Sequence, residues 1–187
     1  NNPVTVSSFS GTIGLPLPGI EIAIKDDDGN SLGFGEVGEL CIKGPNVMAG
    51  YYQQPDETHK TFTADQFMRT GDIAVMDERG FTKIVDRKKD MILVSGFNVY
   101  PNELENVISL CPGVVECAAV GVLDDKKGEA IKVFVVRNDV TLTEDDVARY
   151  CKQNLTGYKQ PKYIEFRDQL PKTNVGKVLR RELRTHA

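Results

Sequence analysis

The segment DRKKD at residues 86–90 separates two parts of the chain with different hydrophobic patterns. Before it, short alternating stretches are separated by turn sequences such as DDDGN at 26–30, a pattern typical of β-hairpins. After it, apolar residues recur at helical spacing between apolar runs typical of strands. The sequence therefore predicts an α+β chain, with a mostly β part over 1–86, a short hinge over 87–90 and a small α+β domain over 91–187.

In the first part, two hairpins are expected. The stretches at 20–25 and 39–43 alternate apolar and polar residues, and a turn sequence lies between them. The stretches at 67–76 and 81–86 flank the turn sequence at 77–80 in the same way. Both pairs are predicted to be antiparallel strands.

The second part predicts a short mixed sheet with flanking helices. Pro101 suits the first turn of a helix, and Glu103 suits its positive end. Thr143 and Asp146 have the spacing of a capping pair for a second helix. Besides these two helices, strands are predicted over 114–123, 130–136 and 163–166.

Composition argues against a nucleic-acid-binding protein and against a membrane-spanning protein. The chain is 40% hydrophobic and 27% charged, which is enough apolar material for a core. With 23 basic and 27 acidic residues its net charge is −4, so no nucleic-acid surface is expected. No apolar run approaches the length of a membrane span, and no signal peptide is visible.

The cysteines do not predict a metal site. They form no C-x-x-C pair, and the two histidines, His59 and His186, lie far from them in sequence. We expect buried, reduced thiols of a cytosolic protein at all four positions, which are Cys41, Cys111, Cys117 and Cys151.

MRTGD at 68–72 is the first segment that suggests chemistry. A carboxylate that follows a glycine at a tight turn is placed to accept two hydrogen bonds from a vicinal diol, as in a ribose. Thr-Gly-Asp is also common in plain turns, so the segment alone leaves both interpretations open.

The second segment is DRKKDMILVSGFNVYPNELE at 86–105. Its mixed charges are typical of solvated surface. Gly96 would let a ligand approach the backbone closely, or would form a hairpin bend. Spacing alone favours a solvated surface for the charged residues and a hairpin bend at Gly96.

The third segment is LPKTNVGKVLRREL at 170–183. Its Gly-Lys pair resembles the end of a Walker A loop, but Pro171 stands where the first glycine should be and Val178 replaces Ser or Thr. The chain is therefore not a P-loop NTPase. Lys177 has a stem long enough to reach a phosphoryl oxygen, or it belongs to a solvated basic tail.

Together these segments resemble the adenylate-forming superfamily of acyl-CoA synthetases, luciferases and peptide-synthetase adenylation domains. The order is GELCIKGPNVMAGYY, RTGD, DRKKDMILVSGFNVYPNELE and PKTNVGK. TGDIAVMDERGFTKIVDRKK at 70–89 and LTGYK are similar to bacterial long-chain fatty acid:CoA ligases. One departure is Asp65-Gln66-Phe67, where that family usually has Asn-Gly-Trp.

The resemblance implies a two-step reaction. A carboxylate attacks the α-phosphate of ATP, with magnesium present, and the thiol of coenzyme A then displaces AMP from the acyl adenylate. Asp72 would hold the ribose hydroxyls and Arg87 would contact the ribose or phosphate region. Lys177 would bridge the acyl carboxylate and the α-phosphate; acetylation there would remove its charge and stop adenylation.

The resemblance also implies movement between the two steps. Lys89 matches the hinge position, about which the small C-terminal domain turns. The loop with Ser95, Gly96 and Phe97 would then approach the pantetheine of coenzyme A. Residues 1–86 would be the end of a larger nucleotide- and acyl-binding body that supplies most magnesium ligands.

The chain opens at Asn1 without a methionine, and we expect a piece of a larger enzyme that is inactive by itself. The resemblance implies fatty acid, ATP and coenzyme A as partners, no nucleic acid, and a cytoplasmic location with peripheral contact to the inner membrane. Two other interpretations stay open. One is a luciferase-like oxygenase or amino-acid-activating relative, and the other is a regulatory module whose basic tail binds phosphate ligands without catalysis.

Overall fold

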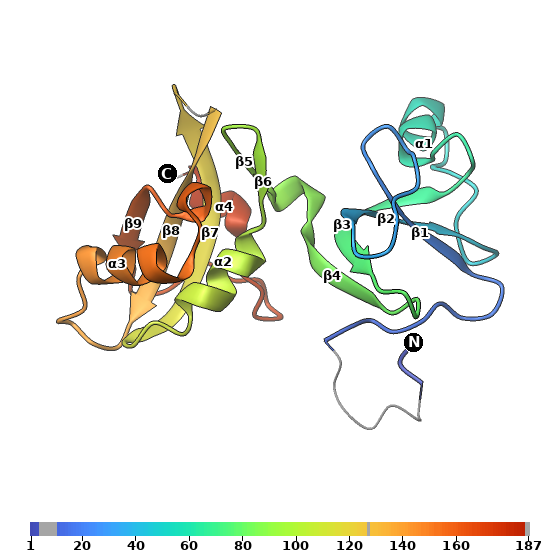
Figure 1. Ribbon diagram of the computed structural model, residues 1–187. Helices are drawn as coiled ribbons and strands as arrows, with labels where there is room; N and C mark the ends of the chain where they lie inside the picture. The colour runs from blue at the N-terminus through green and yellow to red at the C-terminus, as the bar shows by residue number, and fades with distance from the viewer. Residues whose placement is uncertain (4–10, 127, 186–187) are drawn as a thin grey trace. The chain divides into compact units, whose positions relative to one another are not determined.

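The chain is described by a computed structural model that covers residues 1–3, 11–126 and 128–185. It divides into two compact units, Asn1–Lys89 and Asp90–Ala187, called unit 1 and unit 2 below (Figure 1). The junction between them lies inside the segment 87–90. Whether this junction acts as a hinge stays a prediction.

Unit 1 contains a four-stranded antiparallel sheet with strands in sequence order. Both predicted hairpins are confirmed, since β1 pairs with β2 and β3 pairs with β4. Its small core includes Ile24, Leu40 and Ala74. The strands are β1 (Glu21–Lys25), β2 (Val37–Lys43), β3 (Met68–Met76) and β4 (Thr82–Arg87).

Unit 1 also has a short helix that the sequence analysis missed. This helix, α1 (Pro55–Thr61), begins with a proline and carries Asp56 and Glu57 in its first turn, which suits the positive end of a helix. None of its residues is buried. Because α1 lacks an apolar face, hydrophobic periodicity could not reveal it.

A charged contact joins the β1–β2 hairpin to the loop before β3. Lys25 is only 2% exposed, and its Nζ lies 2.9 Å from Asp65 Oδ2 and 3.0 Å from the Gly29 carbonyl oxygen. Hydrogen bonds from Lys25 and Thr63 lower the pKa of Asp65 to about 2. A buried ammonium requires such partners. Asp65, one of the residues that depart from the family pattern, therefore has a structural role.

Unit 2 is built on a mixed sheet, as predicted. Strands β6, β5, β8 and β7 are antiparallel neighbours, and β9 pairs with β8 in parallel. Most of the sheet is the long β7–β8 hairpin. The strands are β5 (Ile92–Val94), β6 (Phe97–Val99), β7 (Val114–Asp124), β8 (Gly128–Arg137) and β9 (Tyr163–Phe166).

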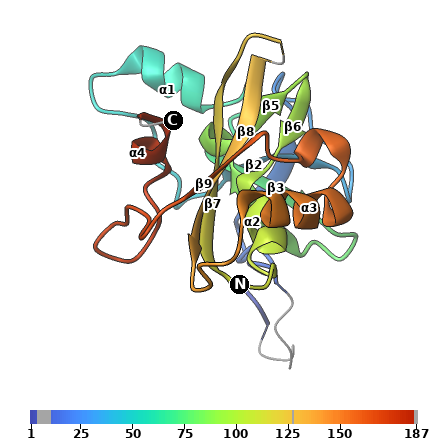
Figure 2. The same ribbon diagram turned by 90° about the vertical axis from the view of Figure 1, so that its left-hand side faces the viewer.

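Helices cover both faces of the β7–β8 hairpin. The helices α2 (Pro101–Ile108) and α3 (Glu144–Asn154) pack on one face, where Val133 belongs to the larger core. The helix α4 (Arg180–Thr185) lies on the other face, where Leu183 packs near Phe134 (Figure 2). Both strands therefore bury alternate residues in two different cores.

Local signals at the helix ends are confirmed. α2 begins at Pro101, and Thr143 and Asp146 form the predicted capping box at the start of α3, with Asp146 N donating to Thr143 Oγ1 over 3.2 Å. α2 ends at Ile108. No helix among the described residues is long and apolar enough to cross a membrane.

The prediction of buried thiols is confirmed for all four cysteines, which are free. Burial raises the pKa of Cys117 to about 12 and the pKa values of Cys41 and Cys151 to about 11. These thiols are therefore protonated at neutral pH and poor nucleophiles. His186 lies outside the described residues.

Gln66 provides a test of backbone strain. It has a φ of 69°, in the left-handed region that glycine tolerates best, within a turn closed by the hydrogen bond from Gln66 N to the Thr63 carbonyl oxygen. Relief of about 1–2 kcal/mol of strain exceeds the extra unfolded-state entropy of glycine, about 0.4–1 kcal/mol. We expect Gln66→Gly to raise the free energy of unfolding by about 0.5–1 kcal/mol, measured by urea denaturation. Gln66→Ala keeps the Cβ and should show no gain; equal effects of the two substitutions would contradict this explanation.

Candidate functional site

The two residues predicted to bind nucleotide lie side by side in unit 1. Asp72 on β3 and Arg87 at the end of β4 are register partners, and Arg87 Nε lies 2.7 Å from Asp72 Oδ1. Their side chains are 26% and 59% exposed, so both are accessible within this unit. An exposed carboxylate beside a guanidinium can accept hydrogen bonds from hydroxyl groups while the remaining N–H groups donate to anionic oxygens.

The segment before Asp72 differs from its predicted geometry. MRTGD lies within β3 and not at a tight turn, and Gly71 has a φ of 74° at an irregular place in the β2–β3 pairing. The side chain of Thr70 braces this place: its Oγ1 donates to the Leu40 carbonyl oxygen over 2.7 Å and accepts from Asp72 N over 3.1 Å. A bulged strand, and not a turn, therefore positions the carboxylate.

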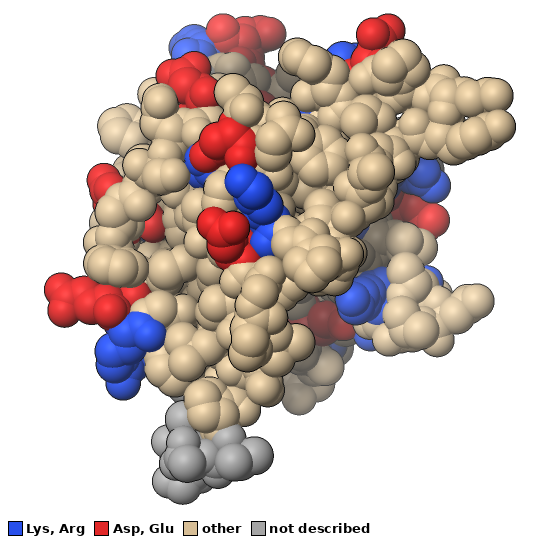
Figure 3. All heavy atoms as spheres, turned by 90° about the vertical axis from the view of Figure 1, so that its right-hand side faces the viewer, with Lys and Arg blue, Asp and Glu red and all other residues tan. Residues whose placement is uncertain are grey.

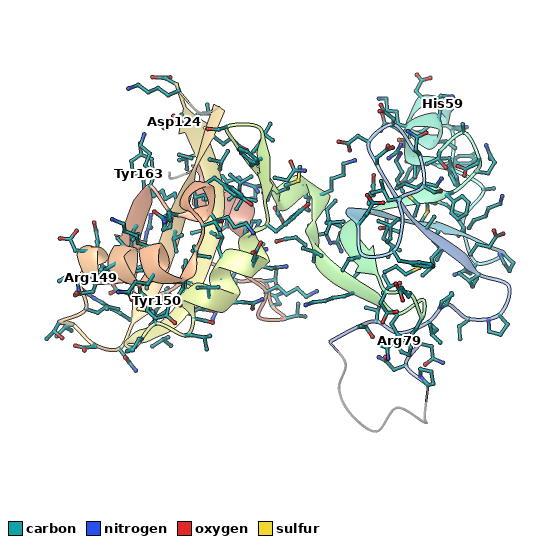
Figure 4. All side chains as sticks on the ribbon, viewed as in Figure 1. His59, Arg79, Asp124, Arg149, Tyr150 and Tyr163 are labelled. Atoms are coloured by element: carbon teal, nitrogen blue, oxygen red, sulfur yellow. The ribbon has the colours of Figure 1, made fainter. Side chains whose placement is uncertain are left out.

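The turn that joins β3 and β4 keeps these strands in register. Asp77 accepts hydrogen bonds from the backbone of Phe81 and from the side chain of Arg79, which Figure 4 labels at this end of the hairpin.

On the face that Figure 3 shows, basic and acidic side chains are interspersed, so positive charge there is locally balanced.

The DRKKD segment is only partly the solvated cluster that its charges suggested. Lys89 is exposed, but Asp86 and Asp90 are buried and Lys88 is half-buried. Lys88 Nζ lies 3.0 Å from the buried carboxylate of Glu39 and 2.7 Å from Asp27. Although burial opposes the charged form, these hydrogen bonds raise the pKa of Lys88 above its ordinary value. The interpretation as surface therefore holds for Arg87 and Lys89 and is wrong for Asp86, Lys88 and Asp90.

The predicted loop for coenzyme A is the tip of the β5–β6 hairpin in unit 2. Ser95 and Gly96 have φ values of 51° and 85°, the two positive values that a type I′ turn requires. Phe97 follows the turn and stacks on Tyr158, with ring centroids 4.8 Å apart and both rings accessible. Sequence reasoning used LTGYK only as a family signal and assigned no role to Tyr158.

Lys177 lies in a separate, well-defined loop of unit 2. The loop is closed by hydrogen bonds from Thr173 N to the Lys177 carbonyl oxygen, 2.8 Å, and from Lys177 N to Thr173 Oγ1, 3.1 Å. The Lys177 side chain is exposed, and its ammonium has no ion-pair partner among the described residues. The basic segment after the loop is not a solvated tail, because it forms α4.

Ion pairs hold α4 and thereby the end of the Lys177 loop. Arg180 Nη2 lies 2.7 Å from Glu105 Oε2 on α2 and 3.0 Å from Asn102 Oδ1. One turn later, Arg184 Nη2 lies 3.1 Å from Asp90 Oδ1. The side chains of Arg180, Glu105 and Asp90 are largely shielded from solvent, so the contacts are stronger than exposed pairs.

Two family models match the chain. The one described as "AMP-binding enzyme" matches residues 2–52, and the one described as "AMP-binding enzyme C-terminal domain" matches residues 103–177. A protein of Escherichia coli named "Long-chain-fatty-acid--CoA ligase" is 59% identical over 186 residues, which are 100% of this chain and 33% of that protein. A Haemophilus influenzae protein of the same name is 56% identical over 97% of the chain and 32% of its own length.

Solved structures agree with this similarity. ATP-bound MatB from Rhodopseudomonas palustris has a TM-score of 0.92 and 38% identity, over 99% of this chain and 37% of that one. o-Succinylbenzoate CoA synthetase (MenE) from Bacillus subtilis, in complex with its acyl-adenylate intermediate, has a TM-score of 0.81 and 34% identity, over 92% and 35% of the two chains.

The chain belongs to the AMP-binding enzyme family. It spans about a third of the length of the curated relatives that it matches. In this member of the family, the structure brings Asp72 and Arg87 together in unit 1, and it places the Ser95–Gly96–Phe97 tip and Lys177 on separate loops of unit 2. Among the residues that the structure describes, no group of three or more His, Cys, Asp or Glu side chains could hold a metal ion.

The role of Arg180 in holding the Lys177 loop can be tested directly. We expect Arg180→Met to accelerate amide hydrogen exchange over residues 173–177 by about tenfold, because it removes the charge-assisted hydrogen bonds to Glu105 and Asn102 that hold α4 at the end of the loop. Arg149→Met, which removes an exposed ion pair with Asp146 on α3, is the matched control and should change exchange in this loop by less than about twofold. Similar exchange in the two variants would show that Arg180 does not hold the loop.

Proposed function

We propose that this chain is part of an ATP-dependent ligase that activates a long-chain fatty acid as an acyl adenylate and transfers the acyl group to coenzyme A. The accessible Asp72–Arg87 pair on neighbouring strands is the observation that carries the proposal. The identity of 56–59% with proteins named long-chain-fatty-acid–CoA ligases supports the choice of acid and acceptor.

In the proposed first step, a carboxylate oxygen of the fatty acid bonds to the α-phosphorus of ATP and the bond to pyrophosphate breaks. Asp72 would accept hydrogen bonds from the ribose hydroxyls. Arg87 uses its Nε in the contact with Asp72, so its remaining N–H groups can donate to ribose or phosphate oxygens. Asp72 and Arg87 would thus fix the nucleotide, and the advantage is one of proximity.

Lys177 would supply the charge that the first step requires. Negative charge develops on the phosphate oxygens as pyrophosphate leaves, and a cation held nearby stabilises it. The exposed ammonium of Lys177 on a hydrogen-bonded loop is suited to that role. The described residues provide no cluster of magnesium ligands, so no step is assigned to a metal held by this chain.

In the proposed second step, the sulfur of coenzyme A bonds to the acyl carbon, the bond to AMP breaks and the thiol proton is lost. The turn with Ser95 and Gly96 would let the pantetheine approach the backbone, with Phe97 beside it. Unit 2 would present this turn after a rotation about Lys89, where the two compact units join. A cytoplasmic location, membrane contact and acetylation of Lys177 stay predictions.

The decisive experiment measures the two half-reactions of the intact enzyme that carries this chain, with palmitate, ATP, magnesium and coenzyme A. We expect Lys177→Ala to lower the rate of adenylation by about 100- to 1,000-fold, because one stabilising cation is lost. Thioester formation from supplied palmitoyl adenylate should be retained. Lys172→Ala, which removes a lysine of the same loop that pairs with Glu116, is the control and should leave both steps near wild type.

The outcomes separate the alternatives. Equal loss of both steps in Lys177→Ala would contradict the role of this lysine. Failure of the wild-type enzyme with every fatty acid in a panel of chain lengths, but activity with another carboxylic acid, would favour a different member of the family. Absence of adenylate formation with any acid would favour a binding module. The chain alone, spanning a third of its relatives, is expected to form no acyl-CoA.

A further inference from the structure

Glu39 is a buried carboxylate that the proposed reaction does not use. It lies on β2 and is 5% exposed. One of its oxygens, Oε2, accepts hydrogen bonds from Arg69 Nη1 over 2.9 Å and from Lys88 Nζ over 3.0 Å. The other, Oε1, accepts from Gly71 N over 3.1 Å. Both oxygens are therefore engaged, and a buried charge that is removed from such a set leaves its partners unsatisfied.

The partners of Glu39 adjoin the two nucleotide-binding residues. Gly71 immediately precedes Asp72, and Lys88 immediately follows Arg87. An added side chain at Gly71 would meet no atom within 4 Å, so packing does not fix this positive-φ residue. The hydrogen bond from its N–H to Glu39 is therefore a main constraint on the direction in which Asp72 leaves the strand.

Lys88 shows the same dependence at the end of β4. Its ammonium bridges two carboxylates of very different exposure, since Asp27 is 87% exposed and Glu39 is 5% exposed. The buried contact is the stronger constraint, because an exposed ion pair contributes little. Glu39 thus holds the last residue before Lys89, the proposed pivot.

We propose that Glu39 is a positioning residue for the nucleotide, which holds the backbone beside Asp72 and the end of the strand beside Arg87 in one arrangement. The inference rests on the proposed function and deepens it. Through a single carboxylate, unit 1 keeps both binding groups aligned and keeps the chain fixed as far as Lys88. Rotation between the two reaction steps then begins at Lys89 and does not disturb the nucleotide.

Three single substitutions and one double variant, Glu39→Gln/Lys88→Met, test this inference in the intact enzyme. Glu39→Gln preserves shape but offers one acceptor oxygen, so its NH2 group must face either the two cations or the Gly71 N–H. Lys88→Met removes the link to β4 and keeps the apolar stem. Asp27→Asn is the matched control, because it removes the negative charge of the other partner of Lys88 and leaves Glu39 in place. The measurements are KM for ATP and kcat of fatty-acid-dependent adenylation, the Kd of AMP, and the thermal midpoint.

The expected result is a change in binding more than in turnover. Glu39→Gln should raise KM for ATP and the Kd of AMP by about 10- to 100-fold, because a binding group displaced by about 1 Å loses affinity of that order. The value of kcat at saturating ATP should stay within about threefold of wild type. Lys88→Met should raise both values by about three- to tenfold. The double variant Glu39→Gln/Lys88→Met should resemble Glu39→Gln, because both substitutions break the same contact, the one between Glu39 and Lys88. Asp27→Asn should match wild type.

Other results overturn the inference. A lower thermal midpoint with unchanged KM and Kd in Glu39→Gln would make Glu39 purely structural, and additive effects in the double variant would separate it from Lys88. If Glu39→Gln does not fold, Lys88→Met is the deciding variant. A KM for ATP and a Kd of AMP in Lys88→Met equal to those of Asp27→Asn would then contradict the proposal. A wild-type enzyme without adenylation activity would instead refute the proposed function itself.

Discussion

The arrangement of unit 1 depends on the neutralisation of one buried negative charge. Glu39 is shielded from water, and it is stable there because two cations and a backbone N–H converge on its oxygens. These donors come from β3 and from the residue after β4, so satisfying a single carboxylate on β2 ties three strands together. The exposed Asp72–Arg87 pair is a consequence, since both residues are neighbours of the groups that bind Glu39.

Unit 2 is stabilised differently, by apolar side chains buried on both faces of one long hairpin. β7 and β8 alternate between a core with α2 and α3 and a second core with α4. The loops at the edges of this hairpin are therefore free to carry chemistry on a rigid base. The Ser95–Gly96 turn and the loop of Lys177 are of this kind, and the Arg180–Glu105 contact extends the rigidity of α2 to the second loop.

Much of the fold could be predicted because its signals are local. Turn sequences located both hairpins of unit 1, and Pro101 and the Thr143–Asp146 pair located the starts of two helices. Asp72 and Arg87 were assigned by resemblance, and their pairing depends only on the register of one short hairpin. Signals of this kind need no knowledge of distant residues.

The remaining features depend on long-range partners or on local geometry that sequence patterns do not report. The burial of Glu39 and Lys25 requires cations and acceptors that lie many residues away. A mixed-charge run was mistaken for surface, because its buried members Asp86 and Asp90 cannot be distinguished by spacing. α1 has no apolar stripe, and the bulge at Gly71 has no sequence signature that separates it from a turn.

The central claim is that unit 1 presents Asp72 to the nucleotide of an adenylate-forming ligase. Fatty-acid-dependent exchange of pyrophosphate into ATP tests it most directly, with the intact enzyme, Asp72→Asn and the exposed control Asp28→Asn at ATP concentrations below KM. The account predicts that Asp72→Asn lowers the exchange rate by about 10- to 100-fold, because the ribose loses its anchor, while Asp28→Asn exchanges at the wild-type rate. Equal rates for the two variants would contradict it.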